Sequence, residues 1–241
     1  TESLEENVSI AVSTPTQVVD LAPLDKISIL RVAAAKELIY DSSNKILEIE
    51  KQANALAAGD TSAMIMYFTS AIHACALLNQ GEYKDAFIVA NNVISMAERE
   101  GFVGIFGPLD AMYVKARCLL EFSQIEESQL LFQQIRNLAT TWHHHIWVYI
   151  AESFIARDLA LAGNSASALE MVRSARGRAL SLTFKNGLDT YCDLTELFIR
   201  FTMKDWGRVG ILLERLPNFL LVERVRAIYE VAVGKTPSNF F

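Results

Sequence analysis

The sequence predicts an all-α protein, a right-handed solenoid of about five antiparallel helix pairs followed by one terminal helix. The first indication is a small-then-apolar signal that recurs at Gly81, Ser123, Gly163 and Lys204, at intervals of 42, 40 and 41 residues. Such a near-constant interval is typical of stacked supersecondary units. The second is that apolar residues recur at i, i+3, i+4 and i+7 from about residue 25 to 233, whereas strand patterns are nearly absent.

The helices follow from this periodicity and from local start and stop signals. The predicted ranges are 25–40 with 43–57, 61–79 with 83–100, 108–121 with 125–139, 144–162 with 165–185, and 188–203 with 205–216, then 218–233. Gly59, Gly101, Gly163 and Gly187 indicate helix ends, and the last helix follows Pro217.

The turn inside each pair determines how closely the two helices approach. A small residue there lets the second helix fold back tightly. Five positions after the turn the residues are Ala86, Ser128 and Ala168, with Val209 as a bulkier exception. The first helices carry Ala74, Ala116 and Ala156 at matching positions, with Leu197 as the exception. Such pairs cannot bury their apolar faces alone, so neighbouring pairs are expected to stack.

The domain organisation and the cellular compartment are predicted from composition. Residues 1–23 lack helical periodicity and contain Thr14-Pro15-Thr16, so we expect a flexible N-terminal arm or linker before one repeat domain at 24–241. Cys75, Cys118 and Cys192 are odd in number and lie in apolar runs, which indicates buried thiols and a cytoplasmic protein. No secretory signal or membrane-spanning run is evident.

The net charge of −6 and the absence of a basic stripe argue against direct nucleic-acid contact. Gly234-Lys235-Thr236 is not expected to bind nucleotide, because a phosphate loop needs glycine where Tyr229 stands. We expect no cofactor.

Histidines give no clear catalytic or metal-binding pattern. His143, His144 and His145 are adjacent, and adjacent helical residues diverge too far to converge on one metal, so a helix start is expected there and no metal site. His73 beside Cys75 resembles a catalytic dyad, but a core histidine is the expected role. No catalytic residues are predicted, and the chain is not expected to be an enzyme.

The turn residues carry a family resemblance. Gly81, Tyr83 and Ala86 match the tetratricopeptide repeat consensus, and Gly163 with Ala168 matches it in part. The period near forty residues is similar to that of the sensor domain of MalT-type regulators, the large ATP-binding activators of the LuxR class. The stretch from Phe122 to Pro217 carries most of this likeness. The resemblance implies a ligand-sensing solenoid between a nucleotide-binding module and a helix-turn-helix module, neither of which is identifiable here.

In tetratricopeptide arrays the first helix of each pair lines a concave groove. Six residues before Ser123 and Gly163 stand Arg117 and Arg157, which we therefore expect to point into this groove. Guanidinium groups bind carboxylates and phosphates bidentately, and Tyr113 and Tyr191 are candidates to stack on the rest of a ligand. Alternatively, both arginines pair with acids such as Glu121 or Glu152.

The expected function is a ligand- or partner-sensing domain of a cytoplasmic bacterial transcriptional regulator, which binds a small-molecule effector, peptide or protein in its groove and relays this to attached modules. The alternative is a tetratricopeptide adaptor that binds a peptide or protein and is unrelated to transcription. The apolar last helix and Phe240-Phe241 also suggest self-association through the terminal helices.

Overall fold

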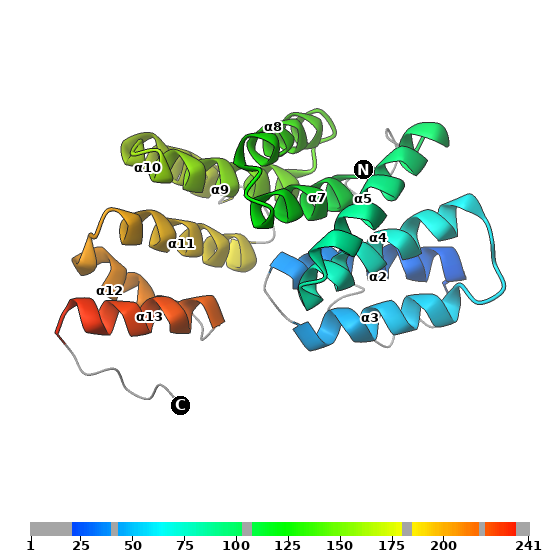
Figure 1. Ribbon diagram of the computed structural model, residues 1–241, viewed down its shortest axis with the longest axis horizontal. Helices are drawn as coiled ribbons and strands as arrows, with labels where there is room; N and C mark the ends of the chain where they lie inside the picture. The colour runs from blue at the N-terminus through cyan, green and yellow to red at the C-terminus, as the bar shows by residue number, and fades with distance from the viewer. Residues whose placement is uncertain (1–20, 40–42, 103–107, 180–184, 217–219, 235–241) are drawn as a thin grey trace. The chain divides into compact units, whose positions relative to one another are not determined.

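The computed structural model describes residues 21–39, 43–102, 108–179, 185–216 and 220–234 (Figure 1). Within these ranges the chain forms eleven α-helices and no strand, so the predicted all-α class is confirmed. Contacts divide the chain into two compact units, Thr1–Ser128 and Gln129–Phe241. Residues 1–20 of the predicted arm, 1–23, lie outside the described residues, and the first helix begins at Pro23, a favoured first helical position.

Unit 1 contains α2 (Pro23–Ile39), α3 (Ser43–Leu56), α4 (Ala63–Gln80), α5 (Tyr83–Arg99) and α7 (Leu109–Glu121). Helix α2 packs on α3 and α4, α3 packs on α4, α4 packs on α5 and α7, and α5 packs on α7. Helices α2 and α4 therefore each contact the next described helix and the one after it. Helix α4 is buried on several sides, which explains why it is apolar almost throughout.

Unit 2 contains most of α8 (Ile125–Thr141), then α9 (His145–Leu161), α10 (Ser165–Ala179), α11 (Lys185–Thr202), α12 (Trp206–Arg215) and α13 (Leu220–Ala232). Helix α9 packs on α10 and α11, α10 packs on α11, α11 packs on α12, and α12 packs on α13. The order of contacts from α9 to α12 repeats the order seen from α2 to α5. No helix within the described ranges is long and apolar enough to span a membrane.

One backbone turn recurs at all four positions that mark the sequence repeat. Gly81, Ser123, Gly163 and Lys204 all have positive φ, at 80°, 61°, 84° and 57°. At each, the amide donates to the carbonyl three residues before it, and the next amide donates to the carbonyl five residues before itself. This pair of hydrogen bonds is the Schellman closure of a helix. The repeat is therefore the same structure four times, even where serine or lysine replaces glycine.

The small residues predicted at the helix crossings are buried. In the second helices these are Ala86, Ser128, Ala168 and Val209, all 0% exposed. In the first helices Ala74, Ala116 and Ala156 are 0% exposed. The Ser128 hydroxyl donates to the Ala116 carbonyl at 2.9 Å, which satisfies the buried hydroxyl and ties α8 to α7. The two exceptions, Val209 and Leu197, pack in one cluster between α11 and α12.

Some local expectations need correction. Gly187 is predicted to end a helix, but it lies in the first turn of α11. The backbone amides of a first turn have no carbonyl acceptor within the helix. His73 is not in the core: its side chain is 48% exposed, and Nδ1 lies 2.6 Å from Glu50 Oε1 of α3. The predicted helix start at His143–His145 is observed, because His143 (φ 58°) closes α8 and His145 opens α9.

Candidate functional site

The predicted groove residues of unit 1 lie one turn apart on α7. The Arg117 guanidinium donates from Nη1 to the Tyr113 hydroxyl at 2.9 Å and lies 5.8 Å from the centre of the Tyr113 ring. Arg117 is half-buried, whereas Tyr113 is only 2% exposed. The phenol therefore fixes the direction of the guanidinium, and its buried ring offers little face to a ligand.

The predicted groove residues of unit 2 lie on α9 and α11. The Arg157 guanidinium carbon lies 5.2 Å from the ring centres of both Phe154 and Phe198, so the cation rests between two aromatic rings. Phe154 in turn stacks on Phe132 of α8, with ring centres 4.3 Å apart and an interplanar angle of 3°. Tyr191 is 7% exposed. Arg157 thus lies within a stack, between Phe154 and Phe198, that joins α8, α9 and α11.

One of the acids proposed as alternative partners of Arg117 and Arg157 pairs with a different arginine. Glu152 pairs with Arg178 of α10, and burial raises the pKa of Glu152 while Arg178 and Arg136 lower it. Arg117 and Arg157 contact aromatic side chains. Their orientation comes from ring contacts on neighbouring turns and helices, which sequence periodicity alone did not indicate.

A buried ion pair in unit 1 was not anticipated. Arg31 of α2 donates to both carboxylate oxygens of Asp110 of α7, from Nε at 2.5 Å and from Nη2 at 2.6 Å. Nη2 also donates to the Tyr67 hydroxyl of α4 at 3.3 Å, and the guanidinium lies 4.8 Å from the centre of the Tyr67 ring. Arg31 and Asp110 are 9% and 4% exposed. The pair links three first helices and lies 79 residues apart in sequence, so no local pattern could have revealed it.

Burial and neighbouring charges set the ionisation of several groups in unit 1. Burial alone lowers the pKa of Arg31, but the Asp110 carboxylate outweighs it and raises that pKa above its usual range. Burial raises the pKa of Tyr67 to about 12, although Arg31 opposes this. Burial also raises the pKa of the Cys75 thiol far above its usual value, and that of Cys118 to about 11. Neutral, buried thiols are poor nucleophiles.

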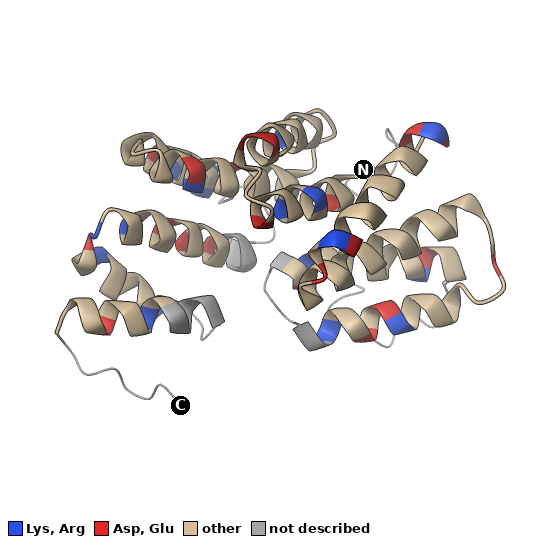
Figure 2. Ribbon diagram, in the orientation of Figure 1, with Lys and Arg blue, Asp and Glu red and all other residues tan. Residues whose placement is uncertain are grey.

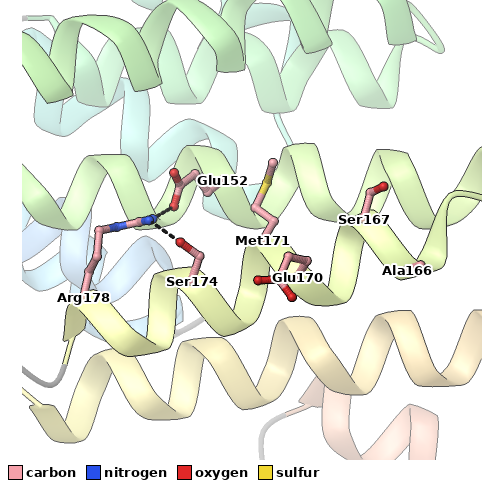
Figure 3. Close-up of a pocket in the computed structure, with 7 residues that line it drawn as sticks. All are labelled: Glu152, Ala166, Ser167, Glu170, Met171, Ser174 and Arg178. Atoms are coloured by element: carbon pink, nitrogen blue, oxygen red, sulfur yellow. Dashed lines mark hydrogen bonds and ion pairs between the residues drawn. The ribbon is translucent and has the colours of Figure 1, made fainter.

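An open hollow of about 570 Å³ lies along α10 in unit 2 (Figure 3). Its lining residues are Glu152, Ala166, Ser167, Glu170, Met171, Ser174 and Arg178. Figure 3 shows Arg178 joined to Glu152 and, at 2.8 Å, to the Ser174 hydroxyl at one end of the hollow. The lining includes serine hydroxyls and charged side chains, so this surface offers polar contacts for binding.

A second polar cluster lies where α10, α11 and α12 meet. Four arginines surround the buried carboxylates of Asp193 and Glu196, which are 6% and 8% exposed. Among the residues that the structure describes, no group of three or more His, Cys, Asp or Glu side chains is placed to hold a metal ion.

No protein-family model, curated protein or solved structure matches this chain.

Proposed function

We propose that this chain is a tetratricopeptide-like, right-handed solenoid that binds a ligand or partner in a concave groove lined by its first helices. In this proposal it is the sensing domain of a cytoplasmic bacterial transcriptional regulator resembling the MalT class. The resemblance lies in the turn residues and the period near forty residues.

The observation that carries the proposal is the identical closure of four helices at Gly81, Ser123, Gly163 and Lys204. In each case the next helix begins two residues later, so the chain reverses in the same way four times. The contacts of α2 with α3 and α4, and of α9 with α10 and α11, support stacked helix pairs, in which a first helix would meet its own partner and the next first helix. Repeat arrays of this kind provide extended concave surfaces for binding.

Arg117 and Arg157 are suited to bind an anionic group because each is oriented by aromatic rings. Tyr113 accepts a hydrogen bond from Arg117, and Arg157 lies between Phe154 and Phe198. A guanidinium that is already oriented loses less conformational entropy when it binds a carboxylate or phosphate.

The proposed mechanism is a population shift. An effector that contacts residues of several repeats binds one curvature of a solenoid better than another, and it shifts the equilibrium by its difference in affinity for the two. Attached modules would then be released or assembled. In this proposal the chain itself neither hydrolyses nucleotide nor contacts DNA.

The binding proposal is tested by a thermal-shift screen of small anions, sugars and peptides, since a ligand of the folded state raises the melting temperature. Ligands found in this way are then measured by calorimetry against Arg117→Met/Arg157→Met. Methionine keeps the aliphatic packing and removes the charge. We expect clearly weaker binding of anionic ligands, whereas the exposed control Arg173→Met keeps full affinity.

Equal binding by the double variant would refute the assignment of these arginines. The regulatory context has a separate test, because the gene on either side of this segment should encode a phosphate loop upstream and a helix-turn-helix downstream. If both are missing, the adaptor that binds a peptide or protein becomes the better proposal.

A further inference from the structure

A cluster of arginines on α10, α11 and α12 is unaccounted for by the groove proposal. We call it the arginine cluster, and its members are Arg176, Arg200, Arg208 and Arg215. It contains none of the groove candidates, and its arginines come from three consecutive helices of unit 2. Figure 2 shows the charged residues along these helices.

Two of the arginines meet at Asp193. Arg176 Nη2 of α10 lies 2.6 Å from Asp193 Oδ1, and Arg215 Nη2 of α12 lies 3.1 Å from Asp193 Oδ2. The carboxylate thus bridges guanidinium groups from both helices that flank α11. Its side chain is 9% exposed, so the arginines cover it.

Three of the arginines meet at Glu196. Arg176 Nη2 lies 3.4 Å from Oε2, while Arg200 Nε and Arg208 Nη2 lie 3.4 Å and 3.7 Å from Oε1. Arg200 also donates from Nη1 to Asp205 Oδ2 at 3.0 Å. Four guanidinium groups therefore share three carboxylates, which leaves one positive charge in excess.

The exposed arginines keep most of their donors available. The side chains of Arg208 and Arg215 are 51% and 57% exposed, and neither guanidinium donates a hydrogen bond to another of the described residues. They lie seven residues apart on the same face of α12, which corresponds to about 10 Å. The acids lie beneath and the arginines at the surface, so a ligand that approaches meets donors first.

We propose that the arginine cluster is a docking surface for an acidic protein segment, whose carboxylates bind Arg208 and Arg215 together. Arginine forks match carboxylates in geometry as well as charge. The carboxylates of Glu196 and Asp193 keep the Arg208 and Arg215 guanidinium groups nearby through ion pairs, which reduces the entropy lost on docking. Two exposed arginines that are about 10 Å apart along the helix axis suit an extended or helical acidic segment with several carboxylates.

The charge distribution favours a short acidic segment over a nucleic acid. Residues 129–241 carry 13 Lys and Arg against 10 Asp and Glu, a net charge of +3, whereas residues 1–128 carry 9 against 18, a net charge of −9. A nucleic acid needs many phosphates neutralised along its backbone. A cluster with a single excess positive charge, in a chain of net charge −6, does not provide that.

The test uses the full chain and fluorescein-labelled oligoglutamate, with oligoglutamine and single-stranded DNA of equal length as the other probes. Affinity is measured by fluorescence anisotropy. We expect oligoglutamate to bind best and its affinity to fall between about 0.05 M and about 0.2 M salt, because exposed charges are screened. Arg208→Gln/Arg215→Gln should weaken binding about tenfold.

The matched control is Arg99→Gln/Arg173→Gln, which makes the same change in net charge at side chains 69% and 72% exposed. It should bind oligoglutamate as the unmodified chain does. Arg208→Lys/Arg215→Lys keeps the charge and loses the forked guanidinium, so its affinity for oligoglutamate should lie between those of the control and the glutamine variant. It replaces the glutamine variant if that variant has a lowered melting temperature.

Three results would overturn the proposal. These are no binding of oligoglutamate at low salt, equal loss in the cluster and control variants, and tighter binding of single-stranded DNA that depends on Arg208 and Arg215. None of them bears on the groove proposal, which rests on Arg117 and Arg157.

Discussion

The repeated turn makes a stability prediction whose sign depends only on the backbone. Gly163 has φ 84°, and a Cβ added there would meet no atom within 4 Å. An L-residue in this conformation costs about 1–2 kcal/mol. Replacing glycine also removes about 0.4–1 kcal/mol of unfolded-state entropy, which acts in the opposite direction. The free energy of unfolding of Gly163→Ala should therefore fall by about 1 kcal/mol.

Lys204 provides the reverse experiment, because it is an exposed lysine with φ 57° at the equivalent position. Lys204→Gly relieves the left-handed strain at the cost of a more flexible unfolded chain. The free energy of unfolding should rise by about 0.5–1 kcal/mol. Because a change of 1 kcal/mol shifts the melting temperature of a chain of this size by about 2–4 °C, both effects are measurable by circular dichroism.

Gly177 is the matched control. It lies in α10 with ordinary helical backbone, and a Cβ there would also meet nothing within 4 Å. Gly177→Ala makes the same chemical change as Gly163→Ala but should raise stability by about 0.8–1 kcal/mol. If Gly163→Ala and Gly177→Ala shifted the melting temperature in the same direction, the assignment of the turn as the cause would be wrong.

Four further outcomes follow from packing and burial. Asp110→Asn should lower the free energy of unfolding in urea by about 3–5 kcal/mol, because it leaves Arg31 charged and buried, and a loss below about 1 kcal/mol would contradict this. The pKa of Tyr67 is about 12 in the folded chain and about 10 in the unfolded chain. The contribution of the neutral Tyr67 side chain to the free energy of unfolding is therefore complete below pH 10 and is lost as the pH rises to 12. Across that range the unmodified chain should lose up to about 3 kcal/mol more than Tyr67→Phe, and parallel curves in pH-dependent urea unfolding would refute this. All three cysteine thiols are buried, so Ellman's reagent should react with them only as the chain unfolds, and rapid reaction of the folded chain would count against it. Gly210→Ala should destabilise the contact of α12 with α13 by about 1–3 kcal/mol in thermal unfolding, because the new Cβ would lie 2.5 Å from the Tyr229 hydroxyl, and Tyr229→Phe in the same chain should restore part of the loss.

The helix pattern could be predicted from sequence because it depends on local signals. Apolar residues at helical spacing and glycine at helix ends act within one or two turns, and most predicted helix boundaries lie within a few residues of those observed. The prediction of a helix end at Gly187 was wrong because it also relied on a local signal. Glycine is compatible with the first turn of a helix as well as with its end. Sequence alone also gave no reason to expect positive φ at Lys204.

The candidate sites were less predictable because they depend on depth and on long-range contacts. Periodicity placed Tyr113 and Tyr191 on first helices, but it did not show that their rings are 2% and 7% exposed. Arg31 and Asp110 meet across 79 residues, and each looks like an ordinary surface charge on its own helix. The shared carboxylates of the arginine cluster likewise could not be predicted without the relative positions of α10, α11 and α12.

The turn explains the reversal of the chain but not which helices form a pair. His143 closes α8 with the same hydrogen bonds that close α7 at Ser123, although in the proposed pairing one turn joins two pairs and the other lies inside a pair. The side chains at the crossings differ instead. At the turn after α7, the small side chain of Ser128 donates directly to the backbone carbonyl of Ala116. Between α8 and α9, Phe132 stacks on Phe154, so this contact is made by two large aromatic rings. Arg157 extends the contact of Phe132 and Phe154 to Phe198 of α11, so one line of side chains joins α8, α9 and α11.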